Sequence, residues 1–250
     1  MSNNIQIIVL AGGQGKRMNN QDLPKVLVPF KGKPIISHLL SAIKDSGYCE
    51  KPVIVVGPKA DQLKAALGPS YQYIFQPEQL GTGNAVLVCR EELVGKVEDV
   101  MILYGDHPLV TAGMIEKLAD THLQSGNVMT MATVKVSDFS GWRQAFFDFG
   151  RIIRDERGRV CEIIERKDAT DLQKEIKEVN PGYYCFKANW LWQNLDQLKN
   201  NNAQKEYYLT DLVGLACHQD QMITTVQIEP KEALGVNTAE QLALVEKMCR

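Results

Sequence analysis

The sequence has no long apolar run, no excess of one charge and no paired cysteines. No apolar segment approaches the roughly 20 residues that span a bilayer, and the first residues lack the basic and apolar regions of a signal peptide. The 28 basic and 30 acidic residues leave a net charge of -2, which gives no general attraction for nucleic acid or an anionic membrane. We therefore expect a cytoplasmic protein without a nucleic-acid or membrane partner.

Cysteine and histidine are both sparse. The 6 cysteines stand far apart without a CxxC pair, and the 4 histidines do not cluster as zinc ligands would. Free, buried thiols are therefore expected.

The chain also contains no Gly/Ser-rich or Pro-rich linker, no internal repeat and no low-complexity tract. With 250 residues, 44% of them hydrophobic, it can bury a large core. This combination predicts one continuous domain over residues 1–250, with about 1–125 and about 126–250 as its two halves.

The first half alternates between strand-like and helix-like segments. Apolar runs without alternation, typical of parallel strands covered on both faces, lie at 5–11, 53–57 and 100–104. Helical spacing follows them at 34–46, 59–67, 81–93 and 111–125, where Thr111 can cap its helix. These repeated βαβ units predict an α/β fold with a mostly parallel central sheet and helices on both faces.

The second half has a mixed pattern. Strands are expected at 128–136, 159–164 and 183–186, and helices at 188–199 and 206–220. We therefore expect a mixed β sheet in this half.

A glycine-rich loop, GGQGKR at 12–17, follows the first expected strand. Its glycines permit close backbone approach to a phosphate, and ligands of open α/β sheets bind beyond the carboxyl ends of the strands. The P-loop pattern is absent, and GxGxxG fails at Met18. A phosphate-binding loop and an ordinary turn with solvated charges both remain open on this evidence.

The segment LPKVL at 23–27 presents a lysine soon after the loop. Pro24 fixes the backbone just before Lys25. Arg17 and Lys25 can then act as separate clamps that neutralise the charge on a triphosphate as pyrophosphate departs. Either cation alone would be interpreted as a surface charge.

The runs LAGGQGKRM at 10–18 and LPK at 23–25 together closely resemble the signature of sugar-phosphate nucleotidyltransferases. The run QPEQLGTGNA at 76–85 resembles the QxEQLGTGxA segment of one group of them, the bacterial N-acetylglucosamine-1-phosphate uridyltransferases. The resemblance implies a Rossmann-like, GT-A-like nucleotidyltransferase fold with a nucleotide-binding first half and a sugar-binding second half. It implies UTP and N-acetylglucosamine 1-phosphate as substrates. The nucleotide-binding residues that it implies are Leu10, Ala11, Gly12, Gly13, Gly15, Gln76, Gly81 and Thr82.

Gln76 can be interpreted from its chemistry as well. Its side chain offers both an amide donor and an acceptor, which is the pairing needed to read the edge of a uracil. Gly81 and Thr82 open an expected helix, whose free N–H groups favour contact with a ligand. The alternative is a helix N-terminus preceded by a loop glutamine.

The run VMILYGDHPL at 100–109 is an apolar strand that ends in a carboxylate. Asp106 can hold Mg²⁺ together with water and substrate phosphates, or can form an Asx turn. The run resembles the family's LYGDxPL motif, which favours the metal. The run LGVNT at 234–238 resembles the family segment that completes the metal site. This resemblance implies Asn237 as the second metal ligand. Without the resemblance, Asn237 would be interpreted as a helix cap.

His107 is interpreted as a loop residue, because the phosphate of a sugar 1-phosphate is already a charged nucleophile and needs no general base. We find no serine or cysteine nucleophile with a paired base.

The resemblance extends to a sugar site. It implies Tyr104, Gly105, Gly150, Glu165 and Asn180 as sugar-binding residues, and a carboxylate and an amide suit a polyhydroxylated acetamido sugar. From composition alone, Glu165 would be a solvated charge. The run NNNAQKEYYLTD at 200–211 resembles a family segment that we interpret as scaffold, with its polar residues capping a helix.

The sequence departs from the family in four places. An insertion within 137–149 carries Trp142, Arg143, Phe146 and Phe147, whose aromatic rings should cover the core, a ligand or another subunit, so that a homo-oligomer is left open. One residue is added between Arg17 and Lys25. Pro181 stands where threonine is common, and no hexapeptide repeat of an acetyltransferase β-helix is present.

Together these features predict a magnesium-dependent enzyme that forms UDP-N-acetylglucosamine and pyrophosphate, without a covalent enzyme intermediate. Arg17, Lys25 and Asp106 would be its catalytic residues. The alternatives are a nucleotidyltransferase for glucose 1-phosphate or dTTP, a non-catalytic UDP-sugar sensor, and a dinucleotide-dependent oxidoreductase, which Met18 disfavours.

Overall fold

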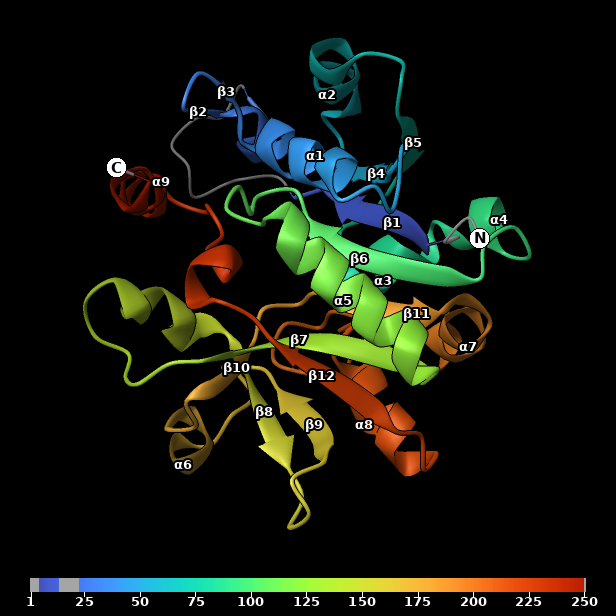
Figure 1. Ribbon diagram of the computed structural model, residues 1–250, viewed down its shortest axis with the longest axis vertical. Helices are drawn as coiled ribbons and strands as arrows, with labels where there is room; N and C mark the ends of the chain where they lie inside the picture. Colours follow the sequence, from blue (N-terminus) through green and yellow to red (C-terminus); the bar gives the residue numbers. More distant parts are fainter. Residues whose placement is uncertain (1–4, 14–22, 250) are drawn as a thin grey trace.

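The computed structural model describes residues 5–13 and 23–249 (Figure 1). Its first half is built on four parallel strands in the order β5-β4-β1-β6. Their bounds are β1 Ile5–Leu10, β4 Val53–Val56, β5 Gln72–Phe75 and β6 Asp99–Tyr104. The three strands expected from apolar runs are confirmed.

The sheet continues into the second half with mixed directions, as expected. Strand β11 (Tyr184–Lys187) lies antiparallel between β6 and β7 (Met129–Lys135). The order then runs β7-β10-β8-β9, and β12 pairs with β7. The remaining bounds are β8 Gly150–Arg154, β9 Val160–Ile164, β10 Glu178–Asn180 and β12 Ile223–Gln227, with a separate hairpin of β2 Pro29–Phe30 and β3 Lys33–Pro34.

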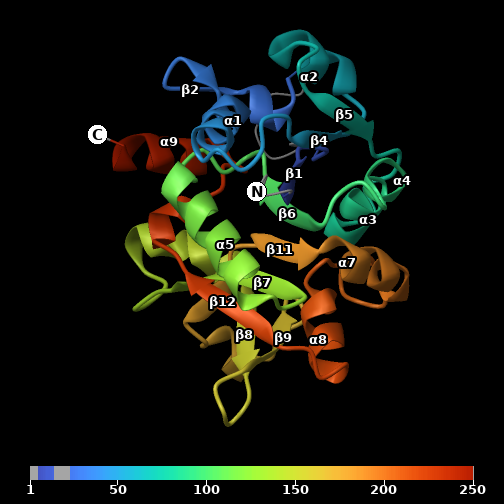
Figure 2. The ribbon, with the colours of Figure 1, turned by 45° about the vertical axis from the view of Figure 1, so that its right-hand side comes forward.

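Helices cover both faces of the sheet. Along β1, Ile7 and Val9 pack into one hydrophobic cluster, and Ile8 and Leu10 pack into another, because successive side chains of a strand point to opposite faces. The first cluster includes α1 (Ile35–Asp45) and α5 (Ala112–Ser125), and the second includes α3 (Thr82–Leu87), α7 (Ala188–Asn194) and α8 (Asp211–His218). Figure 2 shows these two groups of helices on opposite sides of the strands.

The other helices are short or peripheral. They are α2 Ala60–Leu67, α4 Arg90–Leu93, α6 Asp171–Lys174 and α9 Ala239–Met248, with 3-10 segments η1 Lys25–Leu27, η2 Gly141–Asp148, η3 Leu195–Gln197 and η4 Pro230–Ala233. Thr111 caps α5 as expected, because its side chain accepts a hydrogen bond from the backbone N–H of Met114. In the described part of the chain, no helix has both the length and the apolar character that crossing a bilayer requires.

Three expected helices differ from the structure. The helix expected at 188–199 ends at Asn194 and is followed by the 3-10 segment η3. The helix expected at 81–93 is divided into α3 and α4. At the break the backbone N–H of Cys89 donates to the carbonyl of Val86, three residues earlier, which is the hydrogen bond of a 3-10 turn and not of an α-helix. The helix expected at 206–220 begins only at Asp211. The backbone of Tyr207 bonds instead to Leu80 and Gly83, so its hydrogen-bonding groups are not free to form a helical turn.

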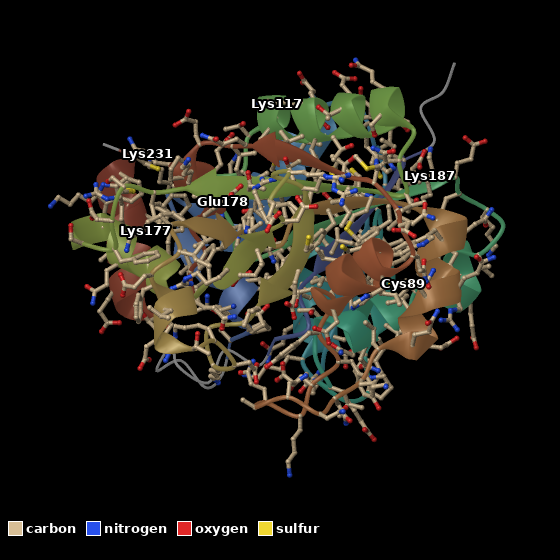
Figure 3. The ribbon with its side chains drawn as sticks, turned by 90° about the horizontal axis from the view of Figure 1, so that it is seen from below. Cys89, Lys117, Lys177, Glu178, Lys187 and Lys231 are labelled. Atoms are coloured by element: carbon tan, nitrogen blue, oxygen red, sulfur yellow. The ribbon has the colours of Figure 1, made fainter. Side chains whose placement is uncertain are left out.

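The six cysteines are free thiols. Cys89 and Cys185 are buried as expected, whereas the other four are half-buried. Figure 3 shows Cys89 inside the molecule, among the helices of the second cluster.

Candidate active site

Two adjoining pockets open where the parallel strands end. In an all-parallel layer the carboxyl ends of the strands share one edge, and here Leu10 at the end of β1 lies beside Tyr104 at the end of β6. The first pocket has a volume of about 380 Å³ and the second about 250 Å³. Four residues line both: Thr82, Tyr104, His107 and Glu206.

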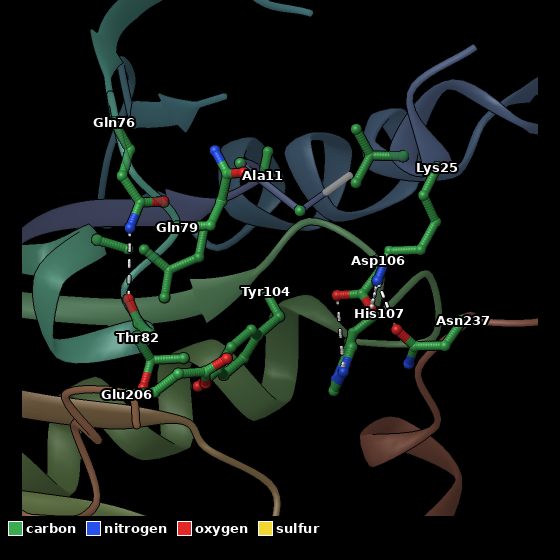
Figure 4. Close-up of a pocket in the computed structure, with 16 residues that line it drawn as sticks. Ala11, Lys25, Gln76, Gln79, Thr82, Tyr104, Asp106, His107, Glu206 and Asn237 are labelled. Atoms are coloured by element: carbon green, nitrogen blue, oxygen red, sulfur yellow. Dashed lines mark hydrogen bonds and ion pairs between the residues drawn. The ribbon is translucent and has the colours of Figure 1, made fainter. Parts of the chain in front are cut away.

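The first pocket contains most of the residues expected for nucleotide and metal (Figure 4). It is lined by Leu10, Ala11, Gly12, Gly13, Lys25, Gln76, Gly81, Thr82, Tyr104, Asp106 and Asn237, among others. Lys25, Asp106 and Asn237 point toward one another at one end, and Gln76 lies at the other. Gly15 and Arg17 lie outside the described residues.

Lys25 joins the two expected metal ligands. Its ammonium donates to the Oδ2 atom of Asp106 at 2.5 Å and to the Oδ1 atom of Asn237 at 2.6 Å. The backbone N–H of Val236 donates to the carbonyl of Asp106 at 2.9 Å, which attaches the last segment of the chain to the end of β6. The three side chains predicted from distant motifs therefore meet at one point.

The electrostatics of this group favour an ionised carboxylate. Burial, the largest single effect, disfavours the charged form of Asp106, but the Lys25 ammonium, His107 and hydrogen bonds to the carboxylate together outweigh it, and the pKa of Asp106 lies below its ordinary value. Burial lowers the pKa of His107, so its ring is neutral near pH 7.

The donor set fits a hard divalent cation. One carboxylate oxygen and one amide oxygen converge on the same cationic group, and a magnesium site usually has one or two such protein ligands completed by water and substrate phosphates. Among the described residues no group of three or more His, Cys, Asp and Glu side chains could hold a metal ion.

Gln76 is held at the other end of the first pocket. Its side chain is buried, and its Nε2 atom donates to the Oδ1 atom of Asn84 at 2.8 Å. Its Oε1 atom lies against Gly12, where an added β-carbon would be 3.0 Å away. Gly81 is the N-cap of α3 and has a φ of 106°, a conformation that favours glycine. The expected helix N-terminus at 81–83 is confirmed.

The second pocket contains four of the five expected sugar residues. Tyr104, Gly150, Glu165 and Asn180 line it, whereas Gly105 lines neither pocket and instead donates its backbone N–H to Leu10. A β-carbon on Gly150 would lie 2.8 Å from Ile163 and 3.4 Å from the Oε1 atom of Glu165, so this position requires glycine.

Glu165 and Asn180 are both oriented by neighbours. Thr210 donates to Glu165 at 3.2 Å, and Asn180 donates to the Tyr184 hydroxyl at 2.7 Å. Burial raises the pKa of Glu165, and the Thr210 hydrogen bond only partly offsets this. Glu165 is therefore not the fully solvated charge that composition alone would suggest.

The interpretation of the run 200–211 as scaffold, with its polar residues capping a helix, was incomplete. Glu206 lines both pockets, and Gln204, Tyr208 and Thr210 line the second. Asn202 stabilises its own loop, since its side chain bonds to Glu206 and to Gln204, while α8 begins later. The polar composition of the run was the signal that a ligand-facing loop was possible.

The interpretation of His107 as a plain loop residue was also incomplete, because His107 is buried and lines both pockets. It contacts the Tyr183 hydroxyl through Nδ1.

The aromatic insertion mainly covers the core. It forms η2, in which Phe146 is completely buried, and Phe149 reaches the second pocket. The buried Arg151 guanidinium holds the insertion by donating to the carbonyls of Phe149, Phe147 and Lys174. Pro181 also lines the second pocket.

A family model described as the MobA-like NTP transferase domain matches residues 7–207. The chain belongs to the family of MobA-like NTP transferase domains. The chain is also similar to proteins named bifunctional protein GlmU. It is 42% identical to that of Heliobacterium modesticaldum over 241 residues, 96% of this chain and 50% of that protein. It is 37% identical to that of Desulfotalea psychrophila over 250 residues, 99% of this chain and 71% of that protein.

The bifunctional protein GlmU of Brevibacillus brevis is 39% identical over 243 residues, 97% of this chain and 51% of that protein. The chain thus spans about half the length of two of these three relatives. A crystal structure of UDP-glucose pyrophosphorylase complexed with UDP-glucose has a TM-score of 0.75, with 17% identity, and the match covers 98% of this chain and 97% of that one. The two proteins share a fold, and the expected nucleotidyltransferase fold is confirmed.

Proposed function

We propose that this protein transfers a uridylyl group from UTP to N-acetylglucosamine 1-phosphate, forming UDP-N-acetylglucosamine and pyrophosphate. The observation that carries the proposal is the meeting of Lys25, Asp106 and Asn237 at one end of the first pocket, where His107, the residue after Asp106, also lines the second pocket. A polyphosphate placed there would have a cationic clamp, oxygen ligands for a divalent ion and a neighbouring sugar pocket. The proposed partners are these two small molecules, in the cytoplasm.

The proposed reaction is an in-line attack by a phosphate oxygen of the sugar phosphate on the α-phosphorus of UTP. The bond from the α-phosphorus to the bridging oxygen breaks, and that oxygen leaves with pyrophosphate. Positioning and charge neutralisation then account for the catalysis, because the attacking oxygen is already charged. Neutral His107 is not needed as a base.

The chain's own residues have separate tasks in this proposal. Asp106 and Asn237 hold the divalent cation, magnesium in our proposal, which when bound would neutralise charge on the nucleotide phosphates. Lys25 leaves these oxygens and pairs with the triphosphate, together with Arg17. Gln76 and Gly81 bind the uracil.

The second pocket would orient the acceptor. The Glu165 carboxylate and the Asn180 amide offer acceptors and a donor for the hydroxyl and acetamido groups of the sugar. Glu206 lies between the pockets and can contact both substrates.

A pyrophosphate-release screen tests the proposal. Purified protein with Mg²⁺ is given UTP, dTTP or CTP in combination with N-acetylglucosamine 1-phosphate or glucose 1-phosphate. We expect the highest kcat/KM with UTP and N-acetylglucosamine 1-phosphate. A higher value for glucose 1-phosphate or dTTP would assign a different transferase specificity, and UDP-sugar binding without any pyrophosphate release would make the protein a sensor.

A further inference from the structure

His107 and Tyr183 form a buried link that the proposed reaction does not use. The Nδ1 atom of His107 lies 2.5 Å from the Tyr183 hydroxyl, which donates to the backbone carbonyl of Glu232 at 2.9 Å. A phenol has a single hydrogen, and this one is used on Glu232. His107 must therefore donate from Nδ1 to the Tyr183 hydroxyl, which fixes the orientation of its ring.

The other edge of the His107 ring lies directly against the backbone of Gly235. A β-carbon on Gly235 would be 2.5 Å from the Nε2 atom and 2.8 Å from the Cδ2 atom of the imidazole. His107 therefore holds the chain on both sides of Leu234, through Tyr183 and Glu232 on one side and through Gly235 on the other. The residue after this contact, Val236, is completely buried and bonds to the backbone of Asp106.

The same ring also packs toward the sugar pocket. The Tyr104 ring stacks on it with a centroid separation of 5.5 Å and an interplanar angle of 27°. Tyr104 in turn lies against Gly182, where an added β-carbon would be 2.5 Å from the Cε2 atom of the ring. Gly182 and Tyr183 are adjacent in the chain. Gly182 packs against Tyr104, which stacks on the His107 ring, and Tyr183 contacts the same ring through its hydroxyl, so one short segment fixes the ring in two ways.

We infer that His107 and Tyr183 are positioning residues that hold the segment 234–237 so that the Asn237 amide faces the Asp106 carboxylate. Neither touches the cation, and the inference rests on the proposed metal role of Asp106 and Asn237. A magnesium ion accepts oxygen ligands only near 2.0–2.1 Å, so a small shift of Asn237 removes a ligand. Partners that orient metal ligands typically change metal affinity about 10- to 100-fold when they are mutated.

The test is Tyr183→Phe, which keeps the ring and removes the hydroxyl. We expect Mn²⁺, titrated into the full chain without substrates and followed by electron paramagnetic resonance, to bind about 10-fold more weakly than to the wild type. The Mg²⁺ concentration for half-maximal pyrophosphate release should rise by a similar factor, while kcat at saturating Mg²⁺ stays within about 3-fold. A merely structural defect would lower the melting temperature without this selective effect on the metal.

Two further variants sharpen the test. His107→Asn keeps an N–H near the position of Nδ1 and should retain Mn²⁺ affinity, whereas His107→Leu should reproduce the loss. Tyr73→Phe is the matched control, because the Tyr73 hydroxyl also donates to a backbone carbonyl, that of Gly68 at 2.7 Å, and lines neither pocket.

The outcomes separate this inference from the proposed function. If the wild type releases pyrophosphate and Tyr183→Phe binds Mn²⁺ as tightly as Tyr73→Phe does, the positioning role is wrong and the enzyme proposal stands. If the wild type neither binds Mn²⁺ nor releases pyrophosphate with any substrate pair, both fail. A selective loss in Tyr183→Phe and His107→Leu, with recovery in His107→Asn, supports the inference.

Discussion

Lys25 and Asn237 stand 212 positions apart in the sequence, and their side chains are joined by a hydrogen bond of 2.6 Å. The same ammonium contacts Asp106 at 2.5 Å. A lysine that bonds both oxygens competes with any cation that uses them. The Lys25 ammonium must therefore move away from these oxygens when the proposed metal and nucleotide bind. Lys25 thus has a different role from Asp106 and Asn237, which would hold the metal.

The first prediction follows from this competition. Lys25→Gln should lower pyrophosphate release about 100- to 1,000-fold, because a charge clamp on the triphosphate is lost. Binding of Mn²⁺ without nucleotide should be unchanged or tighter, since the competing ammonium is gone. Calorimetric Mn²⁺ titration checks this, and a marked loss of Mn²⁺ affinity would show that Lys25 supports the metal site instead of competing with it.

Removal of the Asp106 carboxylate should also lower turnover but should have the opposite effect on metal binding. Asp106→Ala should lower turnover at least about 100-fold and also abolish measurable Mn²⁺ binding, while circular dichroism still reports a folded protein. Asp196→Ala, which removes a largely exposed carboxylate paired with Arg90, is the control and should leave both properties intact. Near-normal turnover of Asp106→Ala with excess Mg²⁺ would refute the role of Asp106.

Glu165 supports a prediction about pH. Burial raises its pKa above the ordinary 4.5, so ionisation of Glu165 opposes folding. Its contribution to stability is complete below pH 4.5 and is lost as the pH rises through the raised value. Glu165→Gln should therefore have a higher melting temperature than the wild type at pH 8, and the difference should shrink toward pH 4.5.

The same substitution should weaken sugar binding, because a charged acceptor is replaced by a neutral amide. We expect the KM for N-acetylglucosamine 1-phosphate to rise about 10-fold at pH 8 while the KM for UTP changes little. Melting curves and initial rates measured across pH 4.5–8 test both effects. Parallel melting profiles of variant and wild type would show that Glu165 is not destabilising when ionised.

A final prediction concerns the base end of the first pocket. Gly12→Ala would place a β-carbon 3.0 Å from the Gln76 Oε1 atom and displace that amide. We expect a several-fold higher KM for UTP and a smaller preference for UTP over CTP. Gly214→Ala, in the middle of α8, meets no atom within 4 Å and should keep normal kinetics with a stability gain of up to about 1 kcal/mol. Equal kinetics in the two variants would contradict the role of Gln76.

Much of the first half was predictable because its signals are local. The unbroken apolar runs predicted β1, β4 and β6, and the cap at Thr111 predicted the start of α5. The short strand β5 has a half-exposed pattern without such a run and was not predicted. The motifs also named most of the residues that line the two pockets, although roles for them are still predictions.

The loop 200–210 was not predictable in the same way. Its backbone pairs with Leu80 and Gly83 instead of forming a helix, which brings Glu206 to both pockets. Helical periodicity describes a segment by itself, whereas this pairing depends on a partner more than a hundred positions earlier. The role of His107 was hidden for the same reason, since its contacts with Tyr183 and Gly235 come from two distant segments.

The sequence by itself determined which segments become strands and which chemical groups end them, because side-chain periodicity and turn chemistry act over a few residues. Only the tertiary structure decided that the Lys25 ammonium bonds Asp106 and Asn237 and that one histidine borders both pockets. Strand order and register set those distances, and they arise from burial of side chains on both faces of the whole sheet.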